Sequence, residues 1–274
     1  MQAEDKYVFP RDYLDNDRIN LQHYLWVRLF GYLLHPSIPT ENPCLKVADI
    51  GTGTGIWLSD LTDKLPPSVE LHGLDISFAA TAPPEWLPSN IKLRQWDVLS
   101  DPPQDLLEAF DVVHIRLFSL VLSNNDVNSV LGRLQGLLKP GGYLQWAEPD
   151  MSTWRTEKTS SHNKADALEQ ILKLSQGDDA RLRPTWVPNL PTLFRNQGLE
   201  DIEVDVKEVP PHLLVPMHEC SLLIPELLIR KDIYTAPVRD QMKGLLEEAA
   251  RETAQGSAWA FTRWSLVGRK PLTA

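Results

Sequence analysis

Three glycines at alternate positions, Gly51, Gly53 and Gly55, follow Asp49 directly after a short apolar run. Glycine adopts left-handed backbone conformations without strain, so a turn of this kind can bring backbone N–H groups against a ligand. A helix is expected to begin at Ile56, and the N-terminus of a helix carries a partial positive charge. The spacing therefore predicts a loop that binds a ligand through its backbone amides.

The loop does not match either of the common nucleotide-binding patterns. The dinucleotide fingerprint places its third glycine one residue later, where this chain has Ile56. The phosphate loop of nucleotide triphosphatases ends in Gly-Lys-Ser/Thr, which does not follow here. An ordinary tight turn between a strand and a helix remains the alternative interpretation.

Acidic residues follow the next two expected strands. Asp75 ends the run Leu71–Asp75, and Asp97 comes directly after Trp96. A carboxylate can accept hydrogen bonds from both hydroxyl groups of a ribose at once, which suits Asp75 to a nucleoside ligand. A further segment, Leu138-Lys139-Pro140-Gly141-Gly142, precedes the fifth expected strand.

These four landmarks, in this order across residues 45–148, resemble the class I methyltransferases that depend on S-adenosyl-L-methionine (SAM). The resemblance implies that SAM is the cofactor, that Asp75 holds its ribose and that Asp97 meets its adenine amino group. The residues it assigns to the cofactor are Asp49, Gly51, Gly53, Gly55, Asp75, Ile76, Asp97, Val98, His114 and His23.

Three further segments resemble the fungal secondary-metabolism methyltransferases, which include the gliotoxin-type amide N-methyltransferases and related regulators. These segments are residues 10–13, 18–23 and 143–150. The likeness implies N- or O-methylation of a small, largely apolar secondary metabolite. Two alternatives stay open: a SAM-binding relative that catalyses another reaction, such as a cyclisation, or a regulatory partner protein of secondary metabolism.

Three residues at the ends of expected strands are candidates for catalysis: His114, Arg116 and Glu148. Methyl transfer from a sulfonium mainly requires that the acceptor be positioned and water excluded. A general base is needed only where the acceptor must lose its proton early, and His114 or Glu148 would serve. Arg116 would orient an acceptor carbonyl. A structural histidine and a structural ion pair are the alternatives for His114 and Arg116.

Tyr13, Trp154 and His162 are the candidates for binding the acceptor. The two aromatic residues suit an apolar molecule, although core packing is the more common role of such side chains. His162 is expected to begin a helix, in a segment where some small-molecule methyltransferases carry a base. Arg18, Gln22 and His23 follow helical spacing on one side of the N-terminal helix, and some of them are expected to touch the methionine carboxylate of SAM.

Hydrophobic periodicity supplies the elements that would position these residues. Helical spacing runs through residues 11–34, 56–65 and 127–138, and short apolar strands are expected at 45–50, 69–74, 91–96, 110–115 and 143–147. Such alternation predicts a parallel sheet wound on both faces, with its ligand at the carboxyl ends of the strands. Residues 201–209 and 259–269 alternate polar and apolar side chains, which predicts a closing antiparallel pair.

The predicted fold is therefore α/β, a doubly wound and mostly parallel seven-stranded sheet with a closing antiparallel hairpin. Residues 1–40 are expected to form an N-terminal helical lid, and residues 41–274 the methyltransferase domain. Within that domain, helical insertions for substrate recognition are expected at about 151–200 and 210–256.

Composition limits the partners. The net charge of −10 in 274 residues, with no basic stripe, argues against nucleic acid. No run approaches the roughly 20 apolar residues of a membrane span, so no membrane is expected, and two cysteines suit the reducing cytoplasm. No metal is expected, because His212, His218 and Cys220 match no zinc spacing. The oligomeric state stays open.

Overall fold

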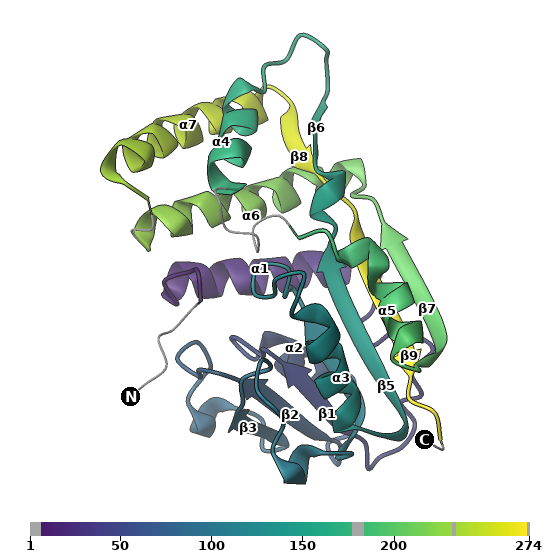
Figure 1. The fold of residues 1–274 in the computed structure, drawn as a ribbon. Coiled ribbons are helices and arrows are strands. Elements are labelled where there is room, and N and C mark those ends of the chain that lie inside the picture. The colour runs from purple at the N-terminus through teal and green to yellow at the C-terminus, as the bar shows by residue number, and fades with distance from the viewer. Residues whose placement is uncertain (1–6, 177–183, 232–233, 273–274) are drawn as a thin grey trace.

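A seven-stranded sheet forms the centre of the computed structural model, which describes residues 7–176, 184–231 and 234–272 (Figure 1). Its strands are β1 (Lys46–Ile50), β2 (Glu70–Asp75), β3 (Ile91–Gln95), β4 (Phe110–Arg116), β5 (Leu138–Pro149), β7 (Glu200–Lys207) and β9 (Arg263–Arg269). Their spatial order is β3-β2-β1-β4-β5-β9-β7. β1 to β5 pair in parallel, whereas β9 runs antiparallel to both β5 and β7. The predicted mostly parallel sheet with a closing antiparallel pair is confirmed.

The described residues form seven α-helices around this sheet. They are α1 (Tyr13–Phe30), α2 (Ile56–Thr62), α3 (Val127–Leu137), α4 (Asp166–Gln176), α5 (Leu190–Asn196), α6 (Pro211–Arg230) and α7 (Ala236–Ala254). Short 3-10 turns span Pro84–Trp86, Gln104–Leu106, Met151–Thr153 and Val187–Asn189. α2 packs on one face of the sheet through Trp57 and Leu58, and α3 and α5 pack on the other through Leu131 and Phe194. The order of the strands reverses between β1 and β4, so the carboxyl ends of these two strands form the expected ligand-binding edge.

α1 lies across the carboxyl ends of the strands, with α6 beyond it (Figure 1). It begins at Tyr13 because the side chain of Asp12 accepts hydrogen bonds from the backbone N–H groups of Leu14 and Asp15. It ends at Gly31, whose φ of 87° is the left-handed conformation that stops a helix. The helix is therefore shorter at both ends than the predicted 11–34.

A second, two-stranded sheet pairs β6 (Arg155–Lys158) with β8 (Ser257–Ala260). The prediction of one continuous strand from Trp259 to Arg269 is therefore wrong. The chain leaves the small sheet and enters the large one at Thr262, whose N–H donates to Thr153 Oγ1 and whose carbonyl accepts from Asp150 N. Alternation of polar and apolar side chains continues through this change of sheet, so it did not reveal the break.

α6 corrects the expectation about apolar stretches. By length and composition alone, this 20-residue helix is apolar enough to cross a membrane, with a mean hydropathy of 1.3 in its best window. Core helices of globular domains pass the same test, and 44% of that window is buried inside the molecule. Leu213, Met217, Leu227 and Leu228 are among the buried residues, so interior packing accounts for this composition.

Candidate cofactor and acceptor site

The glycine loop adopts the left-handed conformation at all three predicted positions. The φ angles of Gly51, Gly53 and Gly55 are 66°, 56° and 76°. The N–H of Gly51 donates to the carbonyl of Leu74 at 2.7 Å. A Cβ atom at Gly51 would lie 2.4 Å from Cζ of Phe118, so both the backbone angle and the available space require glycine there.

Asp75 fastens this loop to the end of β2. Its Oδ2 accepts from Gly53 N at 2.9 Å, and its Oδ1 accepts from Ser77 N at 3.1 Å. Burial raises the pKa of Asp75, and the two amide donors oppose that rise. Each carboxylate oxygen keeps free lone pairs, as a ligand with neighbouring hydroxyl groups requires.

An apolar and an acidic residue stand at the ends of the next strands. Ile76 is 40% exposed directly after Asp75, an unusual position for a large aliphatic side chain. Asp97 is exposed and accepts from Leu99 N, while Val98 is buried. Because β2 pairs with β3, this group lies along one edge and can meet one flat ligand.

Thr52 supplies a test of the fit to SAM that is independent of the motif. Its hydroxyl is buried inside the loop and has no hydrogen-bond partner. An unsatisfied buried hydroxyl costs about 1–3 kcal/mol, so a ligand that bonds to it gains by satisfying it. The N–H groups of Gly51, Gly53 and Gly55 already donate to Leu74, Asp75 and Thr52, so the predicted binding through these amides is not supported. The Asp75 carboxylate, the Thr52 hydroxyl and exposed Ile76 offer groups that an adenosyl moiety can contact, and the residues therefore fit the cofactor.

His114 forms a buried pair with Asp49 beside this loop. Its Nδ1 lies 2.7 Å from Asp49 Oδ1, and its ring stacks on Trp57 at 3.9 Å with 3° between the planes. Burial lowers the pKa of His114, and Asp49 opposes that effect. A neutral imidazole donates its Nδ1 proton to Asp49 in this arrangement, which leaves Nε2 as an acceptor.

Buried His23 and partly buried Arg116 form a second pair. Arg116 Nη2 lies 2.9 Å from His23 Nδ1, and His23 Nε2 lies 3.1 Å from Asp60 Oδ2. Arginine can only donate, so Nδ1 of His23 accepts and its Nε2 carries the proton toward Asp60. Burial and the nearby Arg116 charge lower the pKa of His23 to about 4. His23 therefore ties α1 to α2 and β4 as a neutral side chain.

Glu148 is completely buried, and its carboxylate holds the loop that follows β4 through hydrogen bonds. Its Oε1 accepts from Phe118 N at 2.7 Å and Trp146 Nε1 at 2.8 Å, and its Oε2 accepts from Ser119 N at 3.0 Å. Burial raises the pKa of Glu148 to about 7. These bonds hold Phe118 over Gly51, so Glu148 joins the end of β5 to the glycine loop.

The three predicted acceptor residues are not brought together. Tyr13 is 71% exposed on the first turn of α1. Trp154 packs on Phe261, with ring centroids 4.8 Å apart. His162 is exposed in the loop between β6 and α4 rather than at a helix start, because α4 begins only at Asp166. Figure 1 separates the start of α1 from β6 across the width of the molecule.

Several contributors escaped the sequence analysis. Trp57, Asp60 and Phe118 touch the predicted site residues, yet none belongs to a motif with its own chemistry. Arg263 lies in β9, in the segment predicted as one strand with Trp259. In the sequence, only the spacing of Trp57 and Asp60 on a helix that begins at Ile56 could have indicated which way their side chains point.

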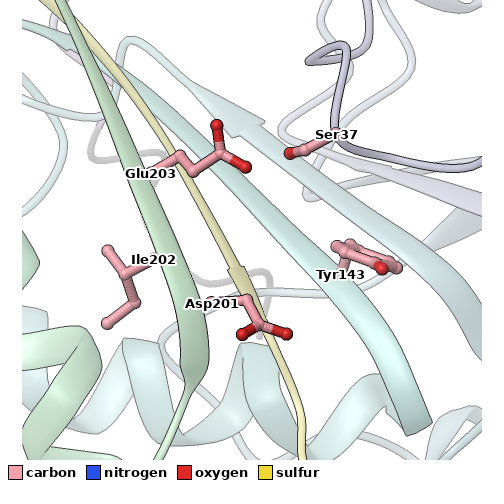
Figure 2. Close-up of a pocket in the computed structure, with 5 residues that line it drawn as sticks. All are labelled: Ser37, Tyr143, Asp201, Ile202 and Glu203. Atoms are coloured by element: carbon pink, nitrogen blue, oxygen red, sulfur yellow. The ribbon is translucent and has the colours of Figure 1, made fainter.

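An open groove of about 450 Å³ lies elsewhere on the molecule, lined by Ser37, Tyr143, Asp201, Ile202 and Glu203 (Figure 2). Its residues come from the amino-terminal parts of β5 and β7 and from the segment after α1. The glycine loop lies at the opposite, carboxyl edge of the sheet, so this groove is separate from the cofactor site.

His218, one of the two histidines that raised the question of a metal, has other partners. His218 Nδ1 accepts from Trp259 N at 3.1 Å, and its Nε2 lies 2.8 Å from Thr253 Oγ1. Within the described part of the chain, no group of three or more His, Cys, Asp and Glu side chains is placed to hold a metal ion.

Comparisons with known proteins agree with this geometry. The model of a methyltransferase domain matches residues 48–144. Methyltransferase grgD of a Penicillium species is 37% identical over 164 residues, 57% of this chain and 56% of that protein. N-methyltransferase gliN of Aspergillus fumigatus is 30% identical over 216 residues, 76% of this chain and 73% of that protein. The chain thus spans little more than half of grgD but nearly three quarters of gliN.

The fold has solved counterparts at low sequence identity. A chain from the complex of the Haloferax volcanii Trm112 methyltransferase activator with its candidate methyltransferase superposes with a TM-score of 0.57. The identity is 15%, and the match covers 98% of this chain and 100% of that chain. The architecture, the cofactor loop and the fungal relatives agree, and the chain belongs to the class I SAM-dependent methyltransferases, in the group of the fungal secondary-metabolism N-methyltransferases.

Proposed function

We propose that this chain transfers the methyl group of SAM to a small, largely apolar secondary metabolite, with nitrogen as the acceptor atom. The observation that carries the proposal is the glycine loop fastened by Asp75, with the buried hydroxyl of Thr52 left for a ligand. The choice of nitrogen over oxygen follows the name of the relative gliN, an N-methyltransferase.

When bound, SAM supplies a methyl carbon that its sulfonium has already activated. Asp75 would hold the ribose hydroxyls, Ile76 and Val98 would pack on the adenine, and Asp97 would meet its amino group. The Thr52 hydroxyl would face a remaining polar atom. Most of these groups are fixed before the ligand arrives, which reduces the ordering cost of binding.

The polar pairs beside the loop, Asp49–His114 and Arg116–His23, would orient the acceptor. Arg116, whose pKa burial lowers to about 10, stays cationic at neutral pH and would donate to an acceptor carbonyl. Neutral His114 has an acceptor Nε2 that would take a proton. Glu148 already accepts three N–H bonds, so we assign it a positioning role in place of the predicted role as base.

Calorimetric titration with SAM and with S-adenosylhomocysteine (SAH) tests the cofactor assignment first. Micromolar binding of both is expected. Turnover of SAM to SAH is then measured with a panel of apolar amides, amines and alcohols, and methylated amide or amine products are expected. Binding accompanied by a rearranged, unmethylated product would favour a cyclase, and failure of the folded protein to bind either compound would favour a regulatory protein.

A further inference from the structure

Arg263 is a buried arginine at the carboxyl edge of the sheet. It is the first residue of β9, paired with Pro149 of β5 and Lys207 of β7, the last residues of those two strands. Its residue exposure is only 7%. The side chain therefore lies at the edge where class I methyltransferase sheets bind their ligands, on the side away from β1.

This guanidinium has no carboxylate partner. Nη1 donates to the carbonyl of Phe261 at 3.2 Å, and the guanidinium carbon lies 4.2 Å from the centre of the Phe261 ring. No Asp or Glu of the described residues forms a salt bridge with it. In the described part of the chain, the titratable group that acts on its charge is the buried thiol of Cys220 on α6.

Two other arginines, Arg18 and Arg116, have the support from carboxylates that Arg263 lacks. Arg18 is 6% exposed, and its Nη2 lies 2.7 Å from Asp15 Oδ1. Arg116 is stabilised by the charges of Asp49 and Glu148. Arg263 is as buried as Arg18, but among the described residues it has neither an ion pair nor a nearby carboxylate charge that stabilises it.

Leaving a buried cation unpaired is costly, because its hydration is lost without a compensating anion. Burial lowers the pKa of Arg263 to about 10, so the group nevertheless stays charged at neutral pH. The structure therefore carries a positive charge that an anionic ligand would satisfy.

The surroundings of Arg263 indicate the kind of ligand. Phe261, beneath the guanidinium, stacks on Trp154 at a centroid distance of 4.8 Å and 18° between planes. Trp154 in turn meets Trp259 edge-on at 4.9 Å. A molecule that fits here combines an apolar or aromatic body with an acidic oxygen group.

We propose that Arg263 anchors the methyl acceptor by binding a carboxylate of that molecule beside the Trp154–Phe261–Trp259 cluster. This inference rests on the proposed function. The carboxylate of SAM itself is a poor match, because β4 and β5 lie between the glycine loop on β1 and Arg263 on β9. The acceptor is accordingly an apolar acid rather than a neutral metabolite.

Benzoate is the probe, and benzamide is its neutral counterpart of nearly the same shape. Each is titrated into protein saturated with SAH, with tryptophan fluorescence as the signal, for the wild type, Arg263→Met and Arg263→Lys. Losing a charge-assisted bond should weaken benzoate binding roughly 10- to 100-fold in Arg263→Met. Arg263→Lys should be intermediate. Benzamide affinity should change less than about twofold, because its neutral amide gains little from the charge.

The thermal stability of the ligand-free protein separates a binding role from a structural one. Removing an unpaired buried charge should raise the Tm of Arg263→Met by about 2–4 °C. Arg18→Met, the matched control, should lower Tm because it leaves Asp15 buried without its partner. A Tm loss in Arg263→Met equal to that in Arg18→Met would overturn the proposal, as would undiminished benzoate binding or no benzoate binding by the wild type.

SAH affinity, measured separately, distinguishes the two proposals. It should stay within about twofold of the wild type in both Arg263 variants, since the cofactor loop lies on another strand. A wild type that fails to bind SAH would contradict the proposed function alone, and the benzoate titration without SAH would then still decide the role of Arg263.

Discussion

At the carboxyl edge of the sheet, the charged and polar side chains near β1 and β4 have different kinds of partner from the arginine on β9. On the cofactor side, around β1 and β4, His114 pairs with Asp49, and Arg116 meets His23, which meets Asp60. On the β9 side, where we propose that the acceptor binds, Arg263 has a carbonyl and an aromatic ring, and no carboxylate among the described residues pairs with it.

The ligands proposed for the two sides would account for this difference. A cofactor shared by a whole family is best met by side chains that the protein has already oriented and neutralised, because little then has to reorganise on binding. An acceptor that differs between relatives is better recognised by a group whose partner the acceptor itself brings. One polar group on the cofactor side, the Thr52 hydroxyl, is nevertheless also left without a partner.

The largest expected effect concerns Glu148, which joins the two sides. Its pKa is about 7 in the folded protein against an ordinary value of 4.5, so the folded state holds a proton that the unfolded state has released between these pH values. Its contribution to stability is therefore full below pH 4.5 and is lost as the pH rises through 7, by up to about 3 kcal/mol. Glu148→Gln should lack this loss.

Urea unfolding of the wild type and Glu148→Gln at pH 5, 6, 7 and 8 measures that difference. The free energy of unfolding of the variant should increase relative to that of the wild type as the pH rises. His23, whose pKa is lowered to about 4, has the opposite slope at acidic pH, but it is present in both proteins and cancels. Parallel pH curves would show that Glu148 is an ordinary ionised carboxylate.

Asp75→Ala tests the cofactor side most directly. Loss of a charged acceptor for the ribose should weaken SAM binding by about 1–3 kcal/mol, roughly 5- to 150-fold. Asp97→Ala is the matched control, and its exposed carboxylate should contribute about fivefold or less. Calorimetry on both variants measures which substitution weakens SAM binding more. Equal losses of affinity would refute the assignment of Asp75 to the ribose.

Thr52→Val examines the exception on the cofactor side. Valine has nearly the same shape as threonine but lacks the unsatisfied hydroxyl, so the ligand-free variant should be more stable by about 1 kcal/mol. If SAM bonds to that hydroxyl, its affinity should fall about 3- to 10-fold. Thermal unfolding with and without SAM gives both quantities, and an unchanged affinity would exclude Thr52 from the cofactor site.

His162→Ala should have the smallest effect. The side chain is exposed in the loop between β6 and α4, away from the carboxyl edge. Turnover with any acceptor found should change less than about twofold, within the usual range for exposed substitutions. A large increase in KM would restore the sequence-based assignment of His162 to the acceptor site and require the loop to move.

Particular residues show where prediction from the sequence succeeded and where it stopped. Gly51, Gly53, Gly55 and Asp75 were identified from spacing, and the structure gives them the expected backbone angles and contacts. Their roles in holding SAM remain predictions that the titrations test. The strand from Trp259 was misjudged because a period of two does not tell which sheet a strand joins.

The sequence by itself determined the order of the strands and helices, the glycine turn and the carboxylate that fastens it. These depend on neighbours along the chain, where side-chain periodicity and backbone preference act directly. The tertiary structure alone decided which charges are paired. Asp49 and His114 are 65 positions apart, whereas Arg263 lies on a strand inserted between β5 and β7, where no carboxylate of the described segments forms an ion pair with it. Pairing across such separations depends on how strands align and how deeply side chains are buried, and no local pattern in the chain records either.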